Sequence, residues 1–215
     1  FIRRWTIIEP INKPNSGNTV FPDSYIQTEL TKEYFPGQCS ADINSLPKAG
    51  DQVIVESEAP RAGGRGGFGG RGAAQAAPAA PATIKDTLTW HSVDSKLFNI
   101  KLIRFATGLT NGQKRYGLIF NAFTVINCEQ DMVVRLAAGS NASSIWWVNG
   151  EKVLTLQADR RMVADDGMSK RVTLKKGKNL VRAAVINGPG MSDMCMRFYE
   201  EDGTTVVKNI TITNK

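Results

Sequence analysis

Histidine and cysteine are scarce in this chain: its 215 residues include one histidine, His91, and three cysteines. Zinc sites are built from such ligands, often with paired cysteines two residues apart, and the sequence has no such pair. An odd number of cysteines leaves at least one thiol without a disulfide partner. Cys128 and Cys195 stand in apolar stretches, so we expect them to be buried free thiols. No metal site is predicted, and the state of Cys39 is left open.

Long apolar runs and catalytic motifs are also missing. No run is long enough to cross a membrane, and no charged-then-apolar leader opens the chain. The chain begins at Phe1, which we interpret as the start of a processed piece of a longer protein. The serine elbow of hydrolases, the HExxH zinc motif and the phosphate-binding loop are absent. These absences predict a chain without a cofactor, a membrane partner or a catalytic centre of its own.

The balance of charge gives a weaker indication. The formal net charge is +7, which favours anionic partners such as acidic polysaccharide, nucleic acid or a membrane surface. The lysines and arginines are spread along the chain, however, and several fall in expected turns. Most of this charge is therefore interpreted as a solvated surface.

Two sets of polar residues are candidates for chemistry. His91 would have to serve any serine triad, and its neighbours Ser92 or Ser95 and Asp94 cannot converge on one another along a strand. A small esterase that uses His91 with distant partners is kept as an alternative. The acidic clusters Asp165–Asp166 and Glu200–Asp202 fall in turns, where carboxylates are usually solvated, although either could help to hold a structural calcium ion.

Strand-like segments dominate the chain. Short runs rich in Val, Ile, Thr and aromatic residues alternate with turn residues, which is typical of pleated, half-buried strands. One short helical turn is expected near Ile26–Tyr34, inside an irregular excursion over Asn12–Gly50. The expected strands are Arg4–Ile8, Gln52–Glu56, Thr87–Trp90, Leu97–Ile103, Tyr116–Ile126, Met132–Ala138, Ser144–Asn149, Lys152–Gln157, Arg171–Leu174, Asn179–Ile186, Asp193–Glu200 and Thr205–Thr213.

Turn residues define how these strands connect. Asn149–Gly150 predicts a tight hairpin, because both residue types accept the positive φ that such turns need. A second hairpin is expected to turn at Lys176–Gly177, and the tail Lys208–Thr213 could pair with the strand Arg4–Ile8. Many short strands with regular turns predict an all-β, two-sheet β-sandwich of jelly-roll type, formed by residues 1–215 as a single domain.

Residues 58–83 interrupt this pattern with glycine, arginine, alanine and proline. The segment contains GGRGGFGGRG followed by an alanine/proline spacer, with Phe68 as its one aromatic residue. So little apolar surface cannot offset the entropy of ordering a chain, so we predict a flexible loop inserted between two strands of one domain. Arg65, Arg71 and Phe68 could contact phosphates and a base, but two repeats are few for such a tract, and nucleic acid is an unlikely partner.

The aromatic pair Trp146–Trp147 is the most informative feature for binding. Neighbours in a strand face opposite sides, so one indole is expected in the core and the other on the outer face or under a loop. An exposed indole offers a face for the C–H bonds of a sugar ring. The favoured interpretation buries both, the second beneath the Asn12–Gly50 excursion. If the chain binds carbohydrate, the candidates are Trp147 and Trp146 for stacking, with Arg160, Arg161 and Asp166 as polar partners.

Three segments, in their order along the chain, match the motifs of a known family. They are FIRRWTIIEPI (Phe1–Ile11), SSIWWVNGEKV (Ser143–Val153) and VTLKKGKNLVRAAVINGPGMSDMCMRFYEEDGTTV (Val172–Val206). Together they resemble the jelly-roll, galactose-binding-like accessory domains of bacterial carbohydrate-active enzymes, and more narrowly the C-terminal module of acetylxylan-esterase-type proteins. Glu9–Pro10 departs from the Gly–Pro usual at the first turn, and the 58–83 insertion is a second departure.

The resemblance implies a non-catalytic module of a bacterial protein that is secreted, periplasmic or at the cell surface. The hydrolytic residues of the parent enzyme would then lie in another domain. We predict weak carbohydrate binding or bracing of the catalytic domain, with polysaccharide or that domain as the partner. Two further hypotheses stay open: a structural or assembly protein that makes protein–protein contacts, and nucleic-acid binding through the 58–83 loop. The oligomeric state is not predicted.

Overall fold

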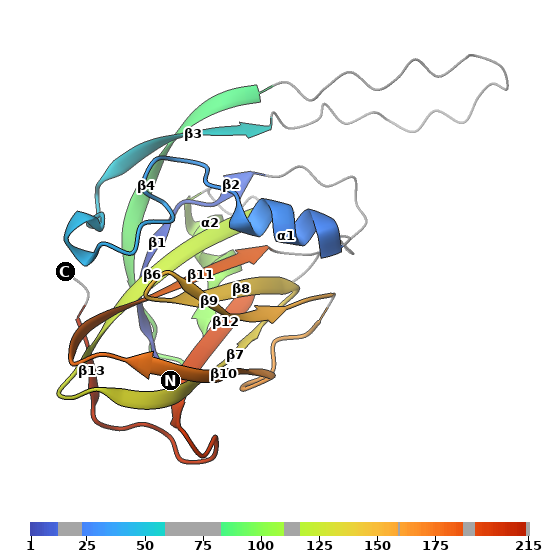
Figure 1. The fold of residues 1–215 in the computed structure, drawn as a ribbon. Helices are drawn as coiled ribbons and strands as arrows, with labels where there is room; N and C mark the ends of the chain where they lie inside the picture. The colour runs from blue at the N-terminus through green and yellow to red at the C-terminus, as the bar shows by residue number, and fades with distance from the viewer. Residues whose placement is uncertain (13–22, 59–82, 110–116, 159, 187–191, 214–215) are drawn as a thin grey trace, which may run out of the picture.

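The chain folds into two antiparallel sheets, with a helix-bearing segment on one outer face (Figure 1). The computed structural model describes residues 1–12, 23–58, 83–109, 117–158, 160–186 and 192–213. Within these ranges the predicted all-β, two-sheet sandwich is confirmed. None of the described helices has the length and apolar character that crossing a membrane would require.

The larger sheet has nine strands. Two short strands, β2 (Ile11–Asn12) and β13 (Ile210–Ile212), pair with opposite ends of its central strand β6. The remaining order is β3 (Gln52–Glu58), β4 (Thr83–Asp94), β1 (Arg4–Ile8), β6 (Leu118–Cys128), β11 (Gly177–Ile186), β8 (Ser143–Val148) and β9 (Glu151–Leu156).

The smaller sheet has four strands, and the described ranges also contain three short helical elements. The strand order is β10 (Gly167–Leu174), β7 (Met132–Ser140), β12 (Asp193–Glu200) and β5 (Ile100–Lys101). The helical elements are α1 (Asp23–Thr31), the 3₁₀ turn η1 (Ile43–Ser45) and α2 (Leu102–Leu109).

The main core lies between the two sheets. Trp5 of β1 and Trp146 of β8 are both fully buried there, with ring centroids 6.1 Å apart in an edge-to-face arrangement. Their indole N–H groups donate to the Ile2 carbonyl at 3.0 Å and to Ser144 Oγ at 2.9 Å. Satisfying these donors allows two large aromatic side chains to be buried without a polar penalty.

A second core lies on the outer face of the larger sheet. It packs residues of the sheet, such as Phe123 and Val125, against Leu30, Tyr34 and Phe35. The last three belong to residues 27–50, which we call the cover segment; α1 at its start runs along this face in Figure 1. Strand β6 is consequently buried on both faces over almost its whole length.

Several local predictions agree with the structure. The β8–β9 hairpin turns at Asn149 and Gly150, which have φ values of 50° and 85°. All three cysteines are free, with Cys128 and Cys195 buried. The end residues of the predicted 58–83 insertion, Glu58 and Thr83, are paired strand residues; residues 59–82 and their predicted flexibility fall outside the described residues.

The hairpin predicted at Lys176–Gly177 is wrong, because the chain changes sheets there. Strand β10 pairs with β7 in the smaller sheet, whereas β11 pairs with β6 and β8 in the larger one. The side chain of Asn179 holds the crossing: its oxygen accepts from the Lys175 N–H at 2.8 Å and its amide donates to the Lys175 carbonyl at 2.7 Å. A polar turn between two apolar runs has the same local signature whether or not its strands pair.

Two other expectations are corrected. The tail strand β13 pairs with Ile126–Cys128 of β6 and not with β1. Strand β1 lies along the same edge of β6 but pairs with Ala122 and Phe123. The strand predicted over Leu97–Ile103 is limited to β5, and helix α2 follows it. Helical winding brings Leu102, Ile103 and Ala106 to one buried face, which an extended chain would divide between two faces.

Candidate functional site

The two tryptophans predicted for sugar stacking face opposite sides of the larger sheet. Trp146 is 0% exposed between the sheets, so its ring offers no face to a ligand. Trp147 is half-buried on the outer face, where it packs against the second core. The Arg182 guanidinium lies over its ring, 5.3 Å from the centroid. Trp147 is thus already stacked by a cation and bounded by the cover segment.

The polar partners proposed for those tryptophans lie elsewhere. Arg160 and Asp166 form an ion pair of 2.7 Å in the β9–β10 connection, and Arg161 is exposed. This connection contacts the start of β8, where Ser143 Oγ donates to the Ala158 carbonyl at 3.5 Å. Trp147 is four residues farther along the strand, or about 13 Å away. The structure therefore does not bring the five predicted residues into one site.

The acidic clusters considered for calcium are engaged with the protein itself. Asp165 accepts hydrogen bonds from Arg197 and Tyr199, and Glu201 pairs with Arg171 at 2.7 Å. Asp202 accepts from the backbone N–H groups of its own turn, which lowers the pKa of its carboxyl group far below the usual range. Among the described residues no group of three or more His, Cys, Asp or Glu side chains is arranged to hold a metal ion.

His91 forms a pair with a carboxylate. Its Nε2 lies 3.1 Å from Glu9 Oε1, while Glu9 Oε2 accepts from the Thr89 N–H at 3.1 Å. The imidazole packs edge-on against Phe105 of α2, with centroids 5.4 Å apart. Asp94, the nearby carboxylate considered for a triad, pairs instead with Arg4. The esterase hypothesis gains no nucleophile from these contacts and stays a prediction.

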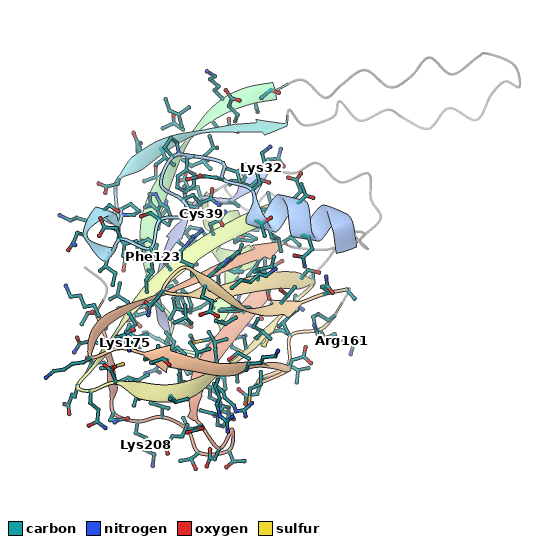
Figure 2. The ribbon with its side chains drawn as sticks, viewed as in Figure 1. Lys32, Cys39, Phe123, Arg161, Lys175 and Lys208 are labelled. Carbon is teal, nitrogen blue, oxygen red and sulfur yellow. The ribbon has the colours of Figure 1, made fainter. Side chains whose placement is uncertain are left out.

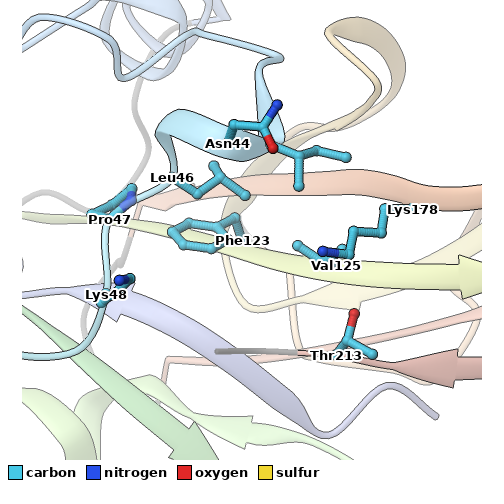
Figure 3. Close-up of a pocket in the computed structure, with 9 residues that line it drawn as sticks. Asn44, Leu46, Pro47, Lys48, Phe123, Val125, Lys178 and Thr213 are labelled. Carbon is cyan, nitrogen blue, oxygen red and sulfur yellow. The ribbon is translucent and has the colours of Figure 1, made fainter.

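A groove opens between the cover segment and the outer face of the larger sheet (Figure 3). We call it the outer groove; its volume is about 210 Å³. Phe123 and Val125 of β6 form its floor, and Lys48 and Lys178 stand on its rim. Its lining residues are Ile43, Asn44, Leu46, Pro47, Lys48, Phe123, Val125, Lys178 and Thr213.

A small cavity of about 30 Å³ adjoins the outer groove. The two share the side chains of Leu46, Pro47 and Phe123. This small cavity is lined by Phe35, Gly37, Gln38, Ser40, Leu46, Pro47, Trp90, Asn121, Ala122, Phe123 and Arg182. A water molecule needs roughly 10–15 Å³ by this kind of measure, so the space accommodates about two small polar groups.

Two residues that line the small cavity each carry a buried donor that has no partner within the described structure. Trp90 and Asn121 are each 5% exposed, and Trp90 Nε1 and Asn121 Nδ2 make no hydrogen bond within the described structure. Asn121 Oδ1, by contrast, accepts from Gln38 Nε2 at 3.3 Å. Buried N–H groups are nearly always bonded to protein, water or ligand, so two such donors beside one cavity indicate a place for an oxygen acceptor.

The charges around both cavities have one sign. Lys48, Lys178 and Arg182 line them, and no aspartate or glutamate is among the described lining residues. The nearest acids in sequence already bond to the backbone: Asp42 accepts from Asn44 N–H at 2.9 Å and Asp51 from Lys48 N–H at 2.7 Å. The site is therefore cationic and rich in donors.

Sequence reasoning missed this site because the packing of the irregular cover segment creates it. Two signals were nevertheless present. Asn121 interrupts the apolar run LIFNAFTVI, and Arg182 interrupts NLVRAAVI. Polar residues inside strands that are buried on both faces are uncommon, and they often mark a paired or functional group.

No protein-family model and no curated protein sequence matches the chain. Among solved structures, it is similar to the PA14 domain of the MpAFP antifreeze protein, with a TM-score of 0.36 and 9% identity over 44% of this chain and 52% of that one. It is also similar to a beta-glucosidase from Kluyveromyces marxianus, with a TM-score of 0.38 and 17% identity over 52% of this chain and 14% of that one. Both likenesses extend over about half of this chain, so the function is inferred from its residues.

Proposed function

We propose that the chain is a non-catalytic accessory module that binds carbohydrate in the outer groove. Its parent would be a secreted bacterial enzyme that degrades polysaccharide and carries its hydrolytic residues in another domain. The observation that carries the proposal is the outer groove itself, an apolar floor with polar groups on its rim. Ligand sites combine such a floor with a few polar groups, and this one is smaller than the ~300–1,000 Å³ typical of drug-sized ligands. It suits one residue of a chain that extends beyond it.

The chemistry of the lining favours binding over catalysis. General acid–base catalysis needs a titratable group within hydrogen-bond reach of the reacting atoms. Among the described residues that line the two cavities there is no histidine, aspartate or glutamate. The His91–Glu9 pair contacts Phe105 of α2, on the side of the larger sheet opposite the cover segment.

The tryptophans keep a supporting role in this proposal. Trp147 holds Arg182 beside the small cavity through the cation–π contact at 5.3 Å, and Arg182 lines that cavity. Trp146 anchors the core between the sheets. Direct stacking of a sugar on Trp147, and contacts from Arg160, Arg161 and Asp166, remain the sequence-based hypothesis for a second location.

The test is a binding screen of the chain against xylan, pectin, cellulose and an acidic polysaccharide. We expect Lys178→Ala to weaken binding by about tenfold, because Lys178 stands on the rim. Lys208→Ala is the matched control: it removes the same charge at an exposed position far from Phe123 (Figure 2). Binding that survives Lys178→Ala but is lost in Trp147→Ala or Arg160→Ala would move the site to the sequence-based location. The absence of binding to every glycan would exclude the proposal.

One observation favours a structural or assembly role as a second candidate. Leu97 and Phe98, adjacent residues between β4 and β5, are 49% and 45% exposed. Apolar side chains exposed together can form a protein–protein contact. Sedimentation of the wild type and of a Phe98→Ser variant tests it: a concentration-dependent assembly that the substitution abolishes would support this role. The nucleic-acid hypothesis rests on residues 58–83, outside the described residues, and stays a prediction.

A further inference from the structure

We propose that the ligand of this site is acidic, an oligosaccharide that contains uronic-acid residues, held by its carboxylates. This inference rests on the proposed carbohydrate function and specifies its substrate class. Three features support it: two cations on β11, a set of side chains that can only donate hydrogen bonds, and the two unpartnered donors on residues that line the small cavity.

The cations are arranged along one strand. Arg182 lies opposite Phe123 in the β6–β11 register, and Lys178 lies opposite Asn127. Residues four apart in a strand share a face, so the Cα atoms of the two cations on the outer face are about 13 Å apart. Leu180, between them on that face, is 1% exposed. Because protein covers Leu180, a ligand would meet Lys178 in the outer groove and Arg182 in the small cavity, which share the side chain of Phe123.

The hydrogen-bonding capacity of the site selects for an acceptor. The Trp90 indole, the Arg182 guanidinium and the lysine ammonium groups donate hydrogen bonds and cannot accept them. Asn121 presents a free donor, because its oxygen already accepts from Gln38. A neutral sugar hydroxyl both donates and accepts, whereas a carboxylate only accepts. Charged hydrogen bonds are also roughly twice as strong as neutral ones. Ser40, Asn44 and Thr213 of the lining can also accept, but the cations and the two unpartnered donors favour a carboxylate over a hydroxyl.

The small cavity adds a size criterion. Its volume of about 30 Å³ admits a carboxylate group but not a sugar ring. The ring would rest in the outer groove against Phe123, which both spaces share. In the ligand-free protein, water can occupy the small cavity and accept hydrogen bonds from Trp90 and Asn121. The two donors can therefore be paired both with and without a bound ligand.

The experiment compares short oligogalacturonides with the same oligomers fully methyl-esterified and with neutral xylo-oligosaccharides, by titration calorimetry of the full chain. We expect at least tenfold tighter binding of the free acid, weakening as salt is raised. Arg182→Gln and Lys178→Gln should each reduce this preference by about tenfold. Lys208→Gln, which removes an equal charge elsewhere, should leave it unchanged.

A second variant tests the small cavity directly. Asn121→Asp keeps the oxygen that accepts from Gln38 and replaces the free donor with an acceptor of negative charge. We expect it to abolish the preference for the acid while neutral oligomers, if they bind, bind as before. Melting curves identify any loss of fold, and Lys178→Gln at the exposed rim provides an independent result in that case.

The outcomes separate this inference from the proposed function. Equal binding of the acid and its methyl ester would overturn the acidic class and leave carbohydrate binding intact. No binding to any oligosaccharide would overturn both. Equal binding of polyglutamate or DNA, weakened as much by Lys208→Gln as by Lys178→Gln, would show diffuse charge attraction and would also overturn the inference.

Discussion

The two sheets are covered on their outer faces in different ways. The smaller sheet lies beneath the β9–β10 connection, which passes so close that a Cβ added at Gly139 would overlap the Val163 carbonyl. The larger sheet lies beneath the cover segment, whose packing leaves the outer groove and the small cavity. Both covers are irregular in sequence, and the packing of the cover segment leaves two described cavities.

Charged hydrogen bonds, in addition to close packing, hold the β9–β10 connection against the smaller sheet. Asp165 of the connection, at φ 56°, accepts from Arg197 Nε at 3.0 Å and from Tyr199 Oη at 2.9 Å. Arg197 in turn lies 4.8 Å from the centroid of the Tyr199 ring. On the larger sheet, apolar packing dominates and two donors are left without partners. We call the outer face of the smaller sheet the sealed face, because the connection lies in direct contact with it. Arg160 Nε of that connection also makes no hydrogen bond within the described structure, so unmatched donors alone do not distinguish the two faces.

The largest expected effect is a loss of stability from a substitution at the sealed face. Gly139→Ala should destabilise the fold by about 3 kcal/mol, because the new methyl group must displace backbone rather than a side chain. For a chain of this size that lowers the melting temperature by roughly 6–12 °C. Gly108→Ala in α2 is the control: a Cβ there meets nothing within 4 Å, and alanine favours helix. A melting temperature unchanged by Gly139→Ala would contradict the close contact.

Asp165→Asn tests the charge that closes the same face. We expect a loss of about 1–2 kcal/mol near neutral pH, because the charged hydrogen bonds to Arg197 are removed while asparagine tolerates positive φ. The exposed pair Arg4–Asp94 supplies the control, since Asp94→Asn should cost less than about 1 kcal/mol. Urea unfolding measures both. Equal losses would mean that Asp165 contributes no more than a surface ion pair.

The same variant has a predicted pH dependence. Burial opposes ionisation of Asp165, but hydrogen bonds from Arg197 and Tyr199 outweigh it and lower the pKa of the carboxyl group. A lowered pKa stabilises the fold above the unfolded value of about 3.9, and this contribution is lost as pH falls through the folded value. The stability difference between wild type and Asp165→Asn should therefore shrink as the pH is lowered from about 5 to about 2. A constant difference would exclude this linkage.

On the outer face of the larger sheet the same kind of substitution should cost little. Asn121→Leu removes an unpartnered donor and one long hydrogen bond, so we expect a change in stability within about 1 kcal/mol. Asn179→Leu is the matched comparison at the sheet crossing, where the side chain bonds to Lys175 and Asn149. It should cost about 3 kcal/mol, since the part-buried N–H and C=O groups of Lys175 and the Asn149 amide lose their partners. A larger loss of stability for Asn121→Leu than for Asn179→Leu would contradict this prediction.

The smallest effect is on thiol reactivity, with no change in stability. Burial raises the pKa of the Cys195 thiol to about 11, and burial also raises that of Cys128. Cys39 in the cover segment is exposed. Iodoacetamide at pH 8 should therefore modify Cys39 in the folded protein and reach the other two only after unfolding. Mass spectrometry reads the sites, and early labelling of Cys195 would show that its cover opens.

The strands were largely predictable because they depend on local alternation and turn chemistry. Arg4–Ile8 and Asp193–Glu200 match β1 and β12 residue for residue, and Asn149–Gly150 forms the predicted turn. Helix α2 was not predicted, because its apolar run resembles a strand until Leu102 and Ala106 meet on one face. The pairing partners of β10 and β13 were not predictable either, since each depends on distant residues.

The candidate site also combines features that the sequence predicted with features that depend on distant residues. Alternation alone indicated that Trp146 and Trp147 face opposite sides, and the structure places one in the core and one on the outer face. It did not indicate that Arg182 lies over Trp147, or that Asn121 lies beside Trp90 in a common cavity. Those contacts join β4, β6, β8 and β11 with the cover segment.

The sequence by itself determined that the chain forms β-strands, where the tight turn at Asn149–Gly150 falls, and that Cys128 and Cys195 are buried. These properties follow from short-range sterics, side-chain periodicity and composition. The tertiary structure alone decided which sheet each strand enters, which outer face is sealed, and where cations and unpartnered donors gather. The physical reason is that burial and hydrogen-bond satisfaction depend on partners brought together from far along the chain, as Gln38, Trp90, Asn121 and Arg182 are around the small cavity.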